Sequence, residues 1–477
     1  MKAGGRVWFP LTLQKDAYSS LIEQKLGIIS SGYENAVVDS IYPDEDFMLG
    51  GGQSYRITDP FESAWAVELG EKAKVHAWTA GTKVPLIWEN AYGEGKFVVD
   101  NIGLYEKALR GFYAASYSLL EDVCAYPVIN GSTFYLDDFP SPVPSGDGTY
   151  VKRDYQTSIA DFYTNIWWPD MLALAEKYGV RYTGVIIENY EDEVDGKTET
   201  AADTERFQYF GNMLLHMGGE IGYHGYNHQP LSLGNVDYGD VLPYKTWESY
   251  DAMEKAVDEL IDFGDQMFPS ADASVYVPPS NVLSKEGRRM LAEDFPRIKT
   301  VASNFFPGEY AYYQEFEVAD DGMVEQPRII SGALIDDYMQ VAAVSELNMH
   351  LVNNHFMHPD DLLDEDRGAR LGWEKLRKRL DTYMGWLYDA APEIRNLTGS
   401  ELSGAVERFA AVTVEAEDAE DEIRLYLQHL YDEAYLLVRL NEGKPGKVSG
   451  GTLTHLTGDL YLLRAERDYV SIQRMED

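Results

Sequence analysis

Hydrophobic and polar positions change between helix-like and strand-like periods through the middle of the chain. Apolar residues at helical spacing predict helices, several of which end at a glycine, and each is followed by a short β-branched run typical of a buried strand. The expected pairs of helix and following strand are 169–178 with 182–188, 202–217 with 220–224, 244–267 with 274–277, and 285–293 with 298–302. Two further strands are expected at 329–334 and 349–355. This alternation predicts parallel strands with crossover helices, as a barrel or an open α/β sheet over about residues 130–365.

The two ends of the chain follow other patterns. Residues 1–125 alternate short β-like runs with turns and end in an amphipathic helix at 104–120, which indicates an accessory α/β domain. Residues 371–389 form a second amphipathic helix, which we expect to pack against the barrel. Beyond residue 405, apolar and charged residues alternate without a long helix, so we expect a small antiparallel β-rich domain. The predicted domains are 1–125, 126–400 and 401–477.

One β-rich run ends in two adjacent carboxylates. Residues 133–136 (TFYL) are followed by Asp137 and Asp138, and prolines at 140, 142 and 144 then stop the strand. The two acids therefore lie at the carboxyl end of a strand, where α/β folds place their active sites. Adjacent carboxylates repel each other, which is tolerable if one binds a cation and the other transfers protons.

Histidines supply partners for these acids. His224 ends a β-like run and His228 follows four residues later, a spacing that brings two imidazoles to one side of a turn. Together with Asp138, they make a set of two imidazoles and one carboxylate that leaves positions open for water and substrate. This set fits zinc, with iron, cobalt and nickel as alternatives. A cation there would activate water for hydrolysis, and Asp137 would take the proton of that water.

Composition narrows the class of partner. The 477 residues include 40 basic and 80 acidic side chains, and the formal charge of −40 argues against a nucleic-acid or anionic-membrane partner. The charge is typical of a highly solvated surface. Alternatively, it favours binding of a cationic substrate or product, such as a polymer of free amino sugars. The single cysteine, Cys124, excludes an intramolecular disulfide.

Membrane and targeting signals are also absent from the sequence. No run of eighteen apolar residues is present, so no transmembrane helix is expected. The first residues lack the apolar core of a signal peptide. The protein therefore stays inside the cell or, if a leader precedes this sequence, is extracellular or at the cell surface.

Four motifs follow one another over about 230 residues: the strand that ends in Asp137-Asp138, the His224/His228 pair, the proline-rich strand end VYVPPSN at 275–281, and HLVNNHFMHPDD at 350–361. This order resembles the polysaccharide deacetylase family with its NodB-homology domain. LDDFPSP and HFMHPDD look closer to a divergent multi-domain branch than to single-domain chitin or peptidoglycan deacetylases. The resemblance implies an incomplete (β/α) barrel and hydrolysis of N-acetyl groups in amino-sugar polymers, such as an exopolysaccharide or a cell-wall glycan.

The resemblance also implies roles for individual residues. Asp137 would be the general base, and Asp138, His224 and His228 would bind the metal ion. His358 would be the general acid that protonates the leaving amine, with His355 as the alternative, because both follow one strand. The residues expected to bind substrate are Tyr226, which stands between the two ligand histidines and is otherwise a core residue, and Pro278, Pro279 and Asn281 of the proline-rich motif.

One feature departs from the family pattern. Family members usually carry an arginine before the proline-rich motif that orients the catalytic aspartate, and residues 274–277 contain none. Arg288, Lys285 or Arg328 could replace it from elsewhere, or hydrogen bonds alone could serve. The missing arginine favours one alternative function, a non-catalytic carbohydrate-binding protein on a degenerate deacetylase scaffold.

A second alternative is a metal-independent glycoside hydrolase, which would use Asp137 or Asp138 with another carboxylate. The acidic run at 360–366 beside His358 is interpreted as a solvated helix start. In the alternative interpretation, Asp360 or Asp361 orients a histidine.

Overall fold

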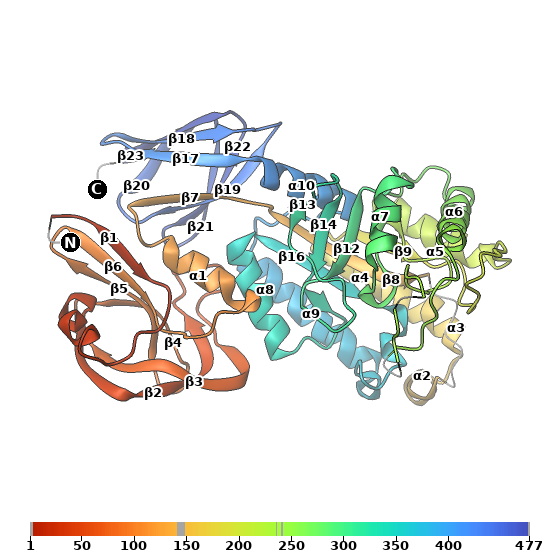
Figure 1. The fold of residues 1–477 in the computed structure, drawn as a ribbon, viewed down its shortest axis with the longest axis horizontal. Coiled ribbons are helices and arrows are strands. Elements are labelled where there is room, and N and C mark those ends of the chain that lie inside the picture. Colours follow the sequence, from red (N-terminus) through yellow and green to blue (C-terminus); the bar gives the residue numbers. More distant parts are fainter. Residues whose placement is uncertain (1–2, 141–147, 235, 240–241, 476–477) are drawn as a thin grey trace.

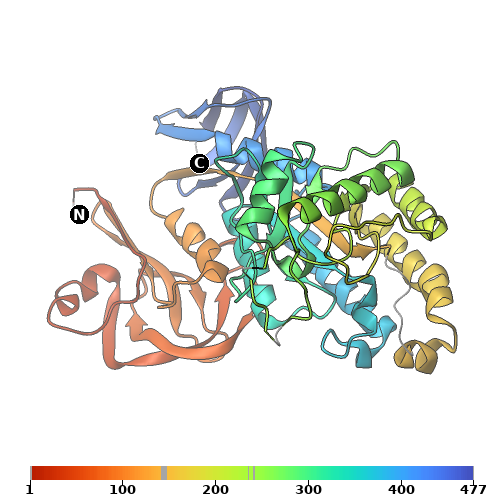
Figure 2. The same cartoon turned by 45° about the vertical axis from the view of Figure 1, so that its right-hand side comes forward.

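The structure is a computed structural model, and it describes residues 3–140, 148–234, 236–239 and 242–475. Three regions follow one another along the chain: an N-terminal β region, a central α/β region and a C-terminal β region (Figure 1). The predicted strand stop at Pro142 and Pro144 lies outside the described residues. The turned view shows the helices gathered around the central region (Figure 2).

The central region is built on a nine-stranded sheet with the order β13-β14-β12-β11-β10-β9-β8-β16-β15. All paired neighbours are parallel except β13 and β14, which are antiparallel. The strands are β8 (Gly131–Phe139), β9 (Tyr182–Ile186), β10 (Glu220–Tyr223), β11 (Val275–Tyr276), β12 (Thr300–Asn304), β13 (Glu317–Val318), β14 (Val324–Arg328), β15 (Ile330–Ser331) and β16 (Val352–Met357).

This sheet curls until its two sides meet. The Ile329 amide donates a hydrogen bond of 2.7 Å to the Asn354 carbonyl, and the Asn354 side chain donates one of 3.1 Å to the Pro327 carbonyl. These bonds join the end of β14 to β16, which lies on the far side of β12, β11, β10, β9 and β8 in the strand order. The central region is therefore a mixed α/β fold with a partial barrel.

Helices connect the strands as the periodicity predicts. The four expected pairs of helix and strand are confirmed, with ends shifted by up to six residues. α4 ends at Gly179 with φ +70°, a left-handed conformation that glycine adopts without strain. The helices of this region are α2 (Thr149–Tyr155), α3 (Ile159–Phe162), the π-helical η4 (Tyr163–Trp167), α4 (Trp168–Tyr178), α5 (Thr204–His216), α6 (Tyr250–Met267), α7 (Lys285–Glu293), α8 (Asp337–Met349), α9 (Trp373–Ala390) and α10 (Gly399–Ala411), with short 3-10 turns η5 (Pro279–Asn281), η6 (Pro359–Leu362) and η7 (Ala369–Leu371).

Several elements of this region were not predicted, and α8 and β14 show why. α8 is buried at every position from Val341 to Asn348, so it lacks the polar stripe that marks an amphipathic helix in a sequence. The strand expected at 329–334 is shorter, the two-residue β15, and β14, which precedes it and ends at Arg328, was not expected. β14 contains Glu325, Gln326 and Arg328 and is buried throughout, so its polarity hides it from a hydrophobicity pattern.

The N-terminal region differs from the expected α/β domain. It is a six-stranded sheet in the order β1-β6-β5-β4-β2-β3, and its one α-helix among the described residues before 123 is α1. The predicted helix at 104–120 shortens to α1 because its first turn is the 3-10 helix η3. The elements are β1 (Arg6–Phe9), η1 (Ser19–Leu21), η2 (Glu23–Leu26), β2 (Ile28–Pro43), β3 (Tyr55–Leu69), β4 (Lys74–Trp78), β5 (Pro85–Tyr92), β6 (Gly95–Asp100), η3 (Lys107–Leu109) and α1 (Arg110–Tyr117).

The C-terminal region consists of two four-stranded antiparallel sheets. Their orders are β17-β18-β23-β20 and β21-β22-β19-β7, so β7, which precedes the barrel, completes the second sheet. β7 crosses the proposed boundary after residue 125, and α10 crosses the one after 400, where strand had been expected from about 405. The strands are β7 (Val123–Val128), β17 (Thr413–Asp418), β18 (Glu422–Gln428), β19 (Ala434–Leu440), β20 (Lys444–Ser449), β21 (Gly451–Thr457), β22 (Leu460–Ala465) and β23 (Tyr469–Met475).

The largest hydrophobic core lies between the central sheet and the helices that cover it. Trp168 of α4, Phe207 of α5, Leu260 of α6 and Met384 of α9 are all buried in it. Each such side chain stabilises the fold by about 1.5–3 kcal/mol relative to an exposed one, so the strand ends are held firmly. Among the described residues, the structure has no helix that is both long and apolar enough to span a membrane.

Candidate metal and acid–base site

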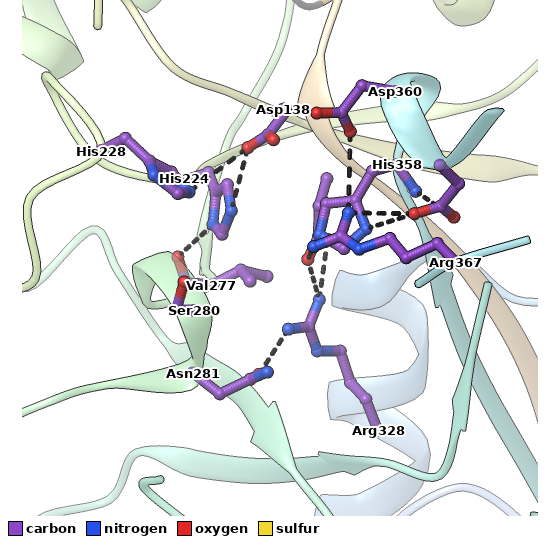
Figure 3. A network of polar contacts seen from close by, with 12 residues as sticks. Asp138, His224, His228, Val277, Ser280, Asn281, Arg328, His358, Asp360 and Arg367 are labelled. Carbon is purple, nitrogen blue, oxygen red and sulfur yellow. Dashed lines mark hydrogen bonds and ion pairs between the residues drawn. The ribbon is translucent and has the colours of Figure 1, made fainter. Parts of the chain in front are cut away.

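Polar groups converge at the carboxyl ends of five strands of the central sheet (Figure 3). Parallel strands bring their carboxyl ends to one edge, so residues far apart in sequence meet there. The side chains are Asp137 and Asp138 from the end of β8, His224 after β10, Arg328 at the end of β14 and His358 after β16, and Val277 after β11 contributes its backbone carbonyl.

Asp138, His224 and His228 form a compact cluster. Asp138 Oδ1 lies 3.3 Å from His224 Nε2 and 3.6 Å from His228 Nε2, and one ligand atom of each residue lies within 4.8 Å of the others. His224 Nδ1 donates a hydrogen bond of 2.7 Å to the Val277 carbonyl, which leaves Nε2 to face the cluster. The tautomer and the ring orientation of His224 are thereby set, as in histidines that bind metals.

The donor atoms of this cluster fit a divalent cation. Asp138 Oδ1 and His224 Nε2 are buried without a hydrogen-bond partner in the described part of the chain. Burial opposes ionisation of Asp138, but His224 and His228 outweigh it and hold the pKa of Asp138 well below its usual range. Burial lowers the pKa of His228 to about 4, so its imidazole is neutral at pH 7. One carboxylate and two neutral imidazoles are the ligands that zinc and similar ions take in open sites.

Asp137 is held by an arginine from another strand. Arg328 Nη1 lies 2.7 Å from Oδ1 and 2.6 Å from Oδ2 of Asp137, and both side chains are buried. Arg328 Nη2 donates to the side-chain oxygen of Asn281, and the guanidinium lies 4.0 Å from the ring centroid of Phe356. Of the three basic residues considered as a replacement for the motif arginine, Arg328 is the one that contacts Asp137, whereas Arg288 pairs with Asp321 and Glu325.

His358 lies on the other side of Asp137. Its Nε2 is 3.7 Å from Asp137 Oδ2, and its Nδ1 is 3.2 Å from Asp361 Oδ1. The His358 amide also donates to Asp361 Oδ2 at 3.1 Å, so Asp361 fixes both the backbone and the ring. Burial alone would lower the pKa of His358, but Asp361 and then Asp137 and Asp138 raise it to about 9.

The backbone at this edge adopts conformations that are unusual for non-glycine residues. Four site residues have positive φ: Asp138 (55°), His228 (59°), Ser280 (48°) and Asn281 (59°). Each such conformation costs on the order of 1–3 kcal/mol and tends to occur where surrounding structure imposes it at functional sites. The packing here therefore holds these side chains in place against a local preference.

Two predicted site residues do not face the cluster. His355 lies within β16, and its Nε2 donates a 2.7 Å hydrogen bond to the Gly332 carbonyl beneath the site. His358 follows the end of β16, and its ring reaches Asp137, whereas the ring of His355 inside the strand does not. The ring of Tyr226 is buried, and its hydroxyl bonds with the backbone of Glu199. Neither side chain is therefore placed to meet a substrate, which corrects both expectations.

The proline-rich motif supports the site rather than lining it. Pro278 and Pro279 are buried, and Pro279 packs against Gly225 between the two histidines. The side chain of Asn281 accepts a hydrogen bond from Arg328. These contacts show that the motif packs against the site and holds Arg328. The substrate-binding role expected for Pro278, Pro279 and Asn281 stays a prediction.

Two tyrosines that were not predicted flank His228. The Tyr244 hydroxyl lies 3.5 Å from His228 Nδ1 and also bonds with Ser280. The ring of Tyr190 lies 5.8 Å from the His228 ring and is 41% exposed. Tyr190 lies in the loop that follows β9. Aromatic residues in the loops after strand ends are the sequence signal that could have indicated Tyr190 as a site residue.

The fold and the cluster define a class: a mixed α/β protein with a partial barrel that carries an open Asp-His-His site beside a second aspartate and a histidine. The chain belongs to the family described as "Uncharacterised protein conserved in bacteria (DUF2194)", whose model matches residues 56–462. A search of curated proteins finds no match.

Solved structures show low overall similarity to this chain. A CE4 family pseudoenzyme from Bacillus anthracis covers 58% of this chain at 13% identity and a TM-score of 0.32, and the match spans 66% of its own length, just under two thirds. The catalytic domain of a peptidoglycan N-acetylglucosamine deacetylase from Eubacterium rectale covers 55% of this chain and 86% of its own, at 11% identity and a TM-score of 0.28. An alpha-fucosidase from Thermotoga maritima covers 73% of this chain and 96% of its own, at 11% identity and a TM-score of 0.31. These scores are too low to decide a function, which has to be inferred from the site.

Proposed function

We propose that the protein is a metal-dependent deacetylase that hydrolyses N-acetyl groups of amino-sugar polysaccharides, an exopolysaccharide or a cell-wall glycan. The observation that carries the proposal is the convergence of Asp138, His224 and His228, with Asp137 and His358 beside them. Hydrolysis of an amide needs an electrophile, a base and an acid in one place. A cation bound by the cluster, Asp137 and His358 would fill these three roles.

Asp138, His224 and His228 would hold the cation, and zinc fits this set best, with iron, cobalt or nickel as alternatives. When bound, the ion would lower the pKa of a coordinated water molecule and polarise the carbonyl of the acetamide. His224 would present Nε2 to the ion, because its Nδ1 is bonded to the Val277 carbonyl.

Asp137 and His358 would transfer the protons. Asp137, fixed by Arg328, takes the proton of the attacking water as general base. His358, held in its protonated form by Asp361, donates a proton to the amide nitrogen, which would otherwise leave as a poor amine anion. Arg328, Asn281 and Asp361 act through these two residues and are positioning residues.

The test is acetate release from a panel of N-acetylated glycans, measured together with the metal content of the purified protein. We expect stoichiometric metal, release that stops on chelation and returns on reconstitution, and a loss of at least 100-fold in Asp137→Asn with metal content unchanged. Asp366→Asn makes the same chemical change in the exposed loop after η6 and should retain full activity.

Two other functions make different predictions in the same experiment. A non-catalytic carbohydrate-binding protein would bind the glycans and release no acetate, although Arg328 now supplies the contact whose absence favoured this alternative. A metal-independent glycoside hydrolase would cleave glycosidic bonds in the presence of a strong chelator. We also propose that the N-terminal domain is accessory to the catalytic one. The division 1–125, 126–400 and 401–477 then holds except at its boundaries, where β7 (Val123–Val128) belongs to the C-terminal sheet and α10 (Gly399–Ala411) spans residue 400.

A further inference from the structure

One carboxylate at this edge has no role in the proposed chemistry. Asp360 lies in η6, two residues after His358, and its side chain is 38% exposed. In Figure 3 one of its carboxylate oxygens is directed toward Arg367 and the other toward the side of the site where Asp138 lies. Burial and then the charge of Asp138 raise the pKa of Asp360, in keeping with this proximity.

Asp360 is incompletely satisfied by its protein neighbours. Arg367 Nη1 lies 3.7 Å from Asp360 Oδ1, which is too far for a hydrogen bond, because the same nitrogen is bonded to Asp361 Oδ1 at 3.0 Å. Asp360 Oδ1 is inaccessible to solvent and has no hydrogen-bond partner within the described ranges. Oδ1 faces Arg367 and cannot be reached from solvent, so the exposed part of the carboxylate is Oδ2, which is directed toward the side of the site where Asp138 lies (Figure 3). Oδ2 accepts no hydrogen bond from the residues that the structure describes, so it is free to accept one from a donor brought by a ligand.

The position of Asp360 relates it to the sugar rather than to the acetyl group. In the proposed reaction the amide nitrogen meets His358, and the acetyl carbonyl meets the Asp138 cluster. The ring that bears this nitrogen then lies next to the backbone that follows His358, which is where Asp360 stands. An ionised carboxylate only accepts hydrogen bonds, so its partner must be a donor.

We propose that Asp360 is a specificity-determining residue that accepts a hydrogen bond from a donor on the amino sugar. The donor is either a hydroxyl of the ring that carries the acetamide or the protonated amino group of an adjacent, already deacetylated sugar. This inference rests on the proposed function and deepens it, because it makes recognition depend on the polar groups of the sugar.

The experiment measures the variants Asp360→Ala and Asp360→Asn. The control is Asp366→Asn, which changes an exposed aspartate in the loop after η6. Substrates are fully N-acetylated and partly deacetylated oligomers of amino sugars. Loss of one charge-assisted hydrogen bond made equally in ground and transition states should raise KM about 10- to 100-fold in Asp360→Ala, with little change in kcat. Asp366→Asn should leave KM unchanged.

Asp360→Asn identifies the donor. The neutral amide oxygen still accepts from a hydroxyl, so a hydroxyl donor predicts near-normal KM for fully acetylated oligomers. An amino donor predicts instead that Asp360→Asn loses the wild-type preference for partly deacetylated oligomers, because the attraction between opposite charges is gone.

An unchanged KM in Asp360→Ala overturns the inference. So does a fall in kcat with a displaced pH profile, because that result would assign Asp360 a positioning role through Arg367 and His358. If the wild-type protein loaded with metal releases no acetate from either oligomer, the proposed function fails as well. Activity of the wild type with an unaffected Asp360→Ala variant counts against the inference alone.

Discussion

Arg328 reaches from the end of β14 to place its Nη1 within 2.7 Å of both carboxylate oxygens of Asp137, and each side chain is almost fully buried. The contact for which residues 274–277 offer no arginine is thus made by an arginine of β14. It compensates the charge of Asp137 in a place where water cannot, so the pair is formed at the cost of desolvating both groups.

Breaking this pair should destabilise the fold as well as stop the reaction. Arg328→Met leaves the Asp137 carboxylate buried without a counter-charge, which we expect to cost about 3–5 kcal/mol of unfolding free energy. The double variant Asp137→Asn/Arg328→Met removes both charges and should recover most of that stability without recovering acetate release. Urea unfolding of the two single variants and the double variant measures the coupling. Additive single effects would show that the two residues do not depend on each other.

Metal binding should depend on the cluster and not on the neighbouring histidine of β16. We expect Asp138→Asn and His224→Gln to lose stoichiometric metal, because each removes one of three ligands. His355→Gln is the matched control, since its ring bonds with Gly332 away from the cluster, and it should keep its metal. Elemental analysis after dialysis gives the result. Metal retained in Asp138→Asn but lost in His355→Gln would reverse the assignment.

Removal of the ion should also lower thermal stability. A ligand that binds only the folded state stabilises it by about 2.7 kcal/mol at 100 times its dissociation constant. The melting temperature of the wild-type protein should therefore fall on chelation and recover when zinc is restored. Asp138→Asn should melt at the same temperature with and without zinc, and a zinc-dependent shift in that variant would place the ion elsewhere.

The pH dependence of turnover should report on His358 and Asp361. The general acid must be protonated, so activity falls as pH rises through the pKa of His358, which Asp361 helps to raise. Asp361→Asn removes this negative charge and lowers the pKa of His358. The alkaline limb of the kcat profile should therefore move to lower pH. An alkaline limb that stays in place would exclude His358 as the titrating acid, and Asp366→Asn serves as the control for a charge change in the same loop.

A separate pH effect is expected in the N-terminal region. Burial raises the pKa of Asp100 to about 7, although hydrogen bonds from Ser116 and Trp8 act in the opposite direction. The folded state therefore keeps a proton that the unfolded chain releases near pH 4. The contribution of Asp100 to stability is therefore fully present below about pH 4 and is lost as pH rises to about 7. The shift corresponds to an effect on the order of 4 kcal/mol.

Asp100→Asn removes this titration and keeps an oxygen that can accept both hydrogen bonds. Relative to the wild type, the variant should gain stability as pH rises from 4 to 7, as measured by urea unfolding. Asp59→Asn, an exposed change on β3, should show no such gain. A constant difference between Asp100→Asn and the wild type across this range would mean that Asp100 does not titrate as expected.

Local patterns were sufficient for the elements that bury one face and for the chemistry at strand ends. The helix and strand pairs from α4 to β12 follow from periodicity, because each helix has an apolar stripe and a recognisable end. Asp137 and Asp138 were placed at the end of a strand because prolines stop it. α8 and β14 were missed because α8 is buried on most sides and β14 carries polar side chains inside the barrel.

The sequence by itself determined which residue types could form a metal and acid–base site, since motif order and strand ends are local properties of the chain. Only the tertiary structure decided that Arg328 meets Asp137, that His358 rather than His355 faces the cluster, and that Tyr226 lies in the core. It also decided that β7 joins the C-terminal sheet. These outcomes depend on how the sheet curls and which face of each strand turns inward, and both are set by packing between segments far apart in the chain.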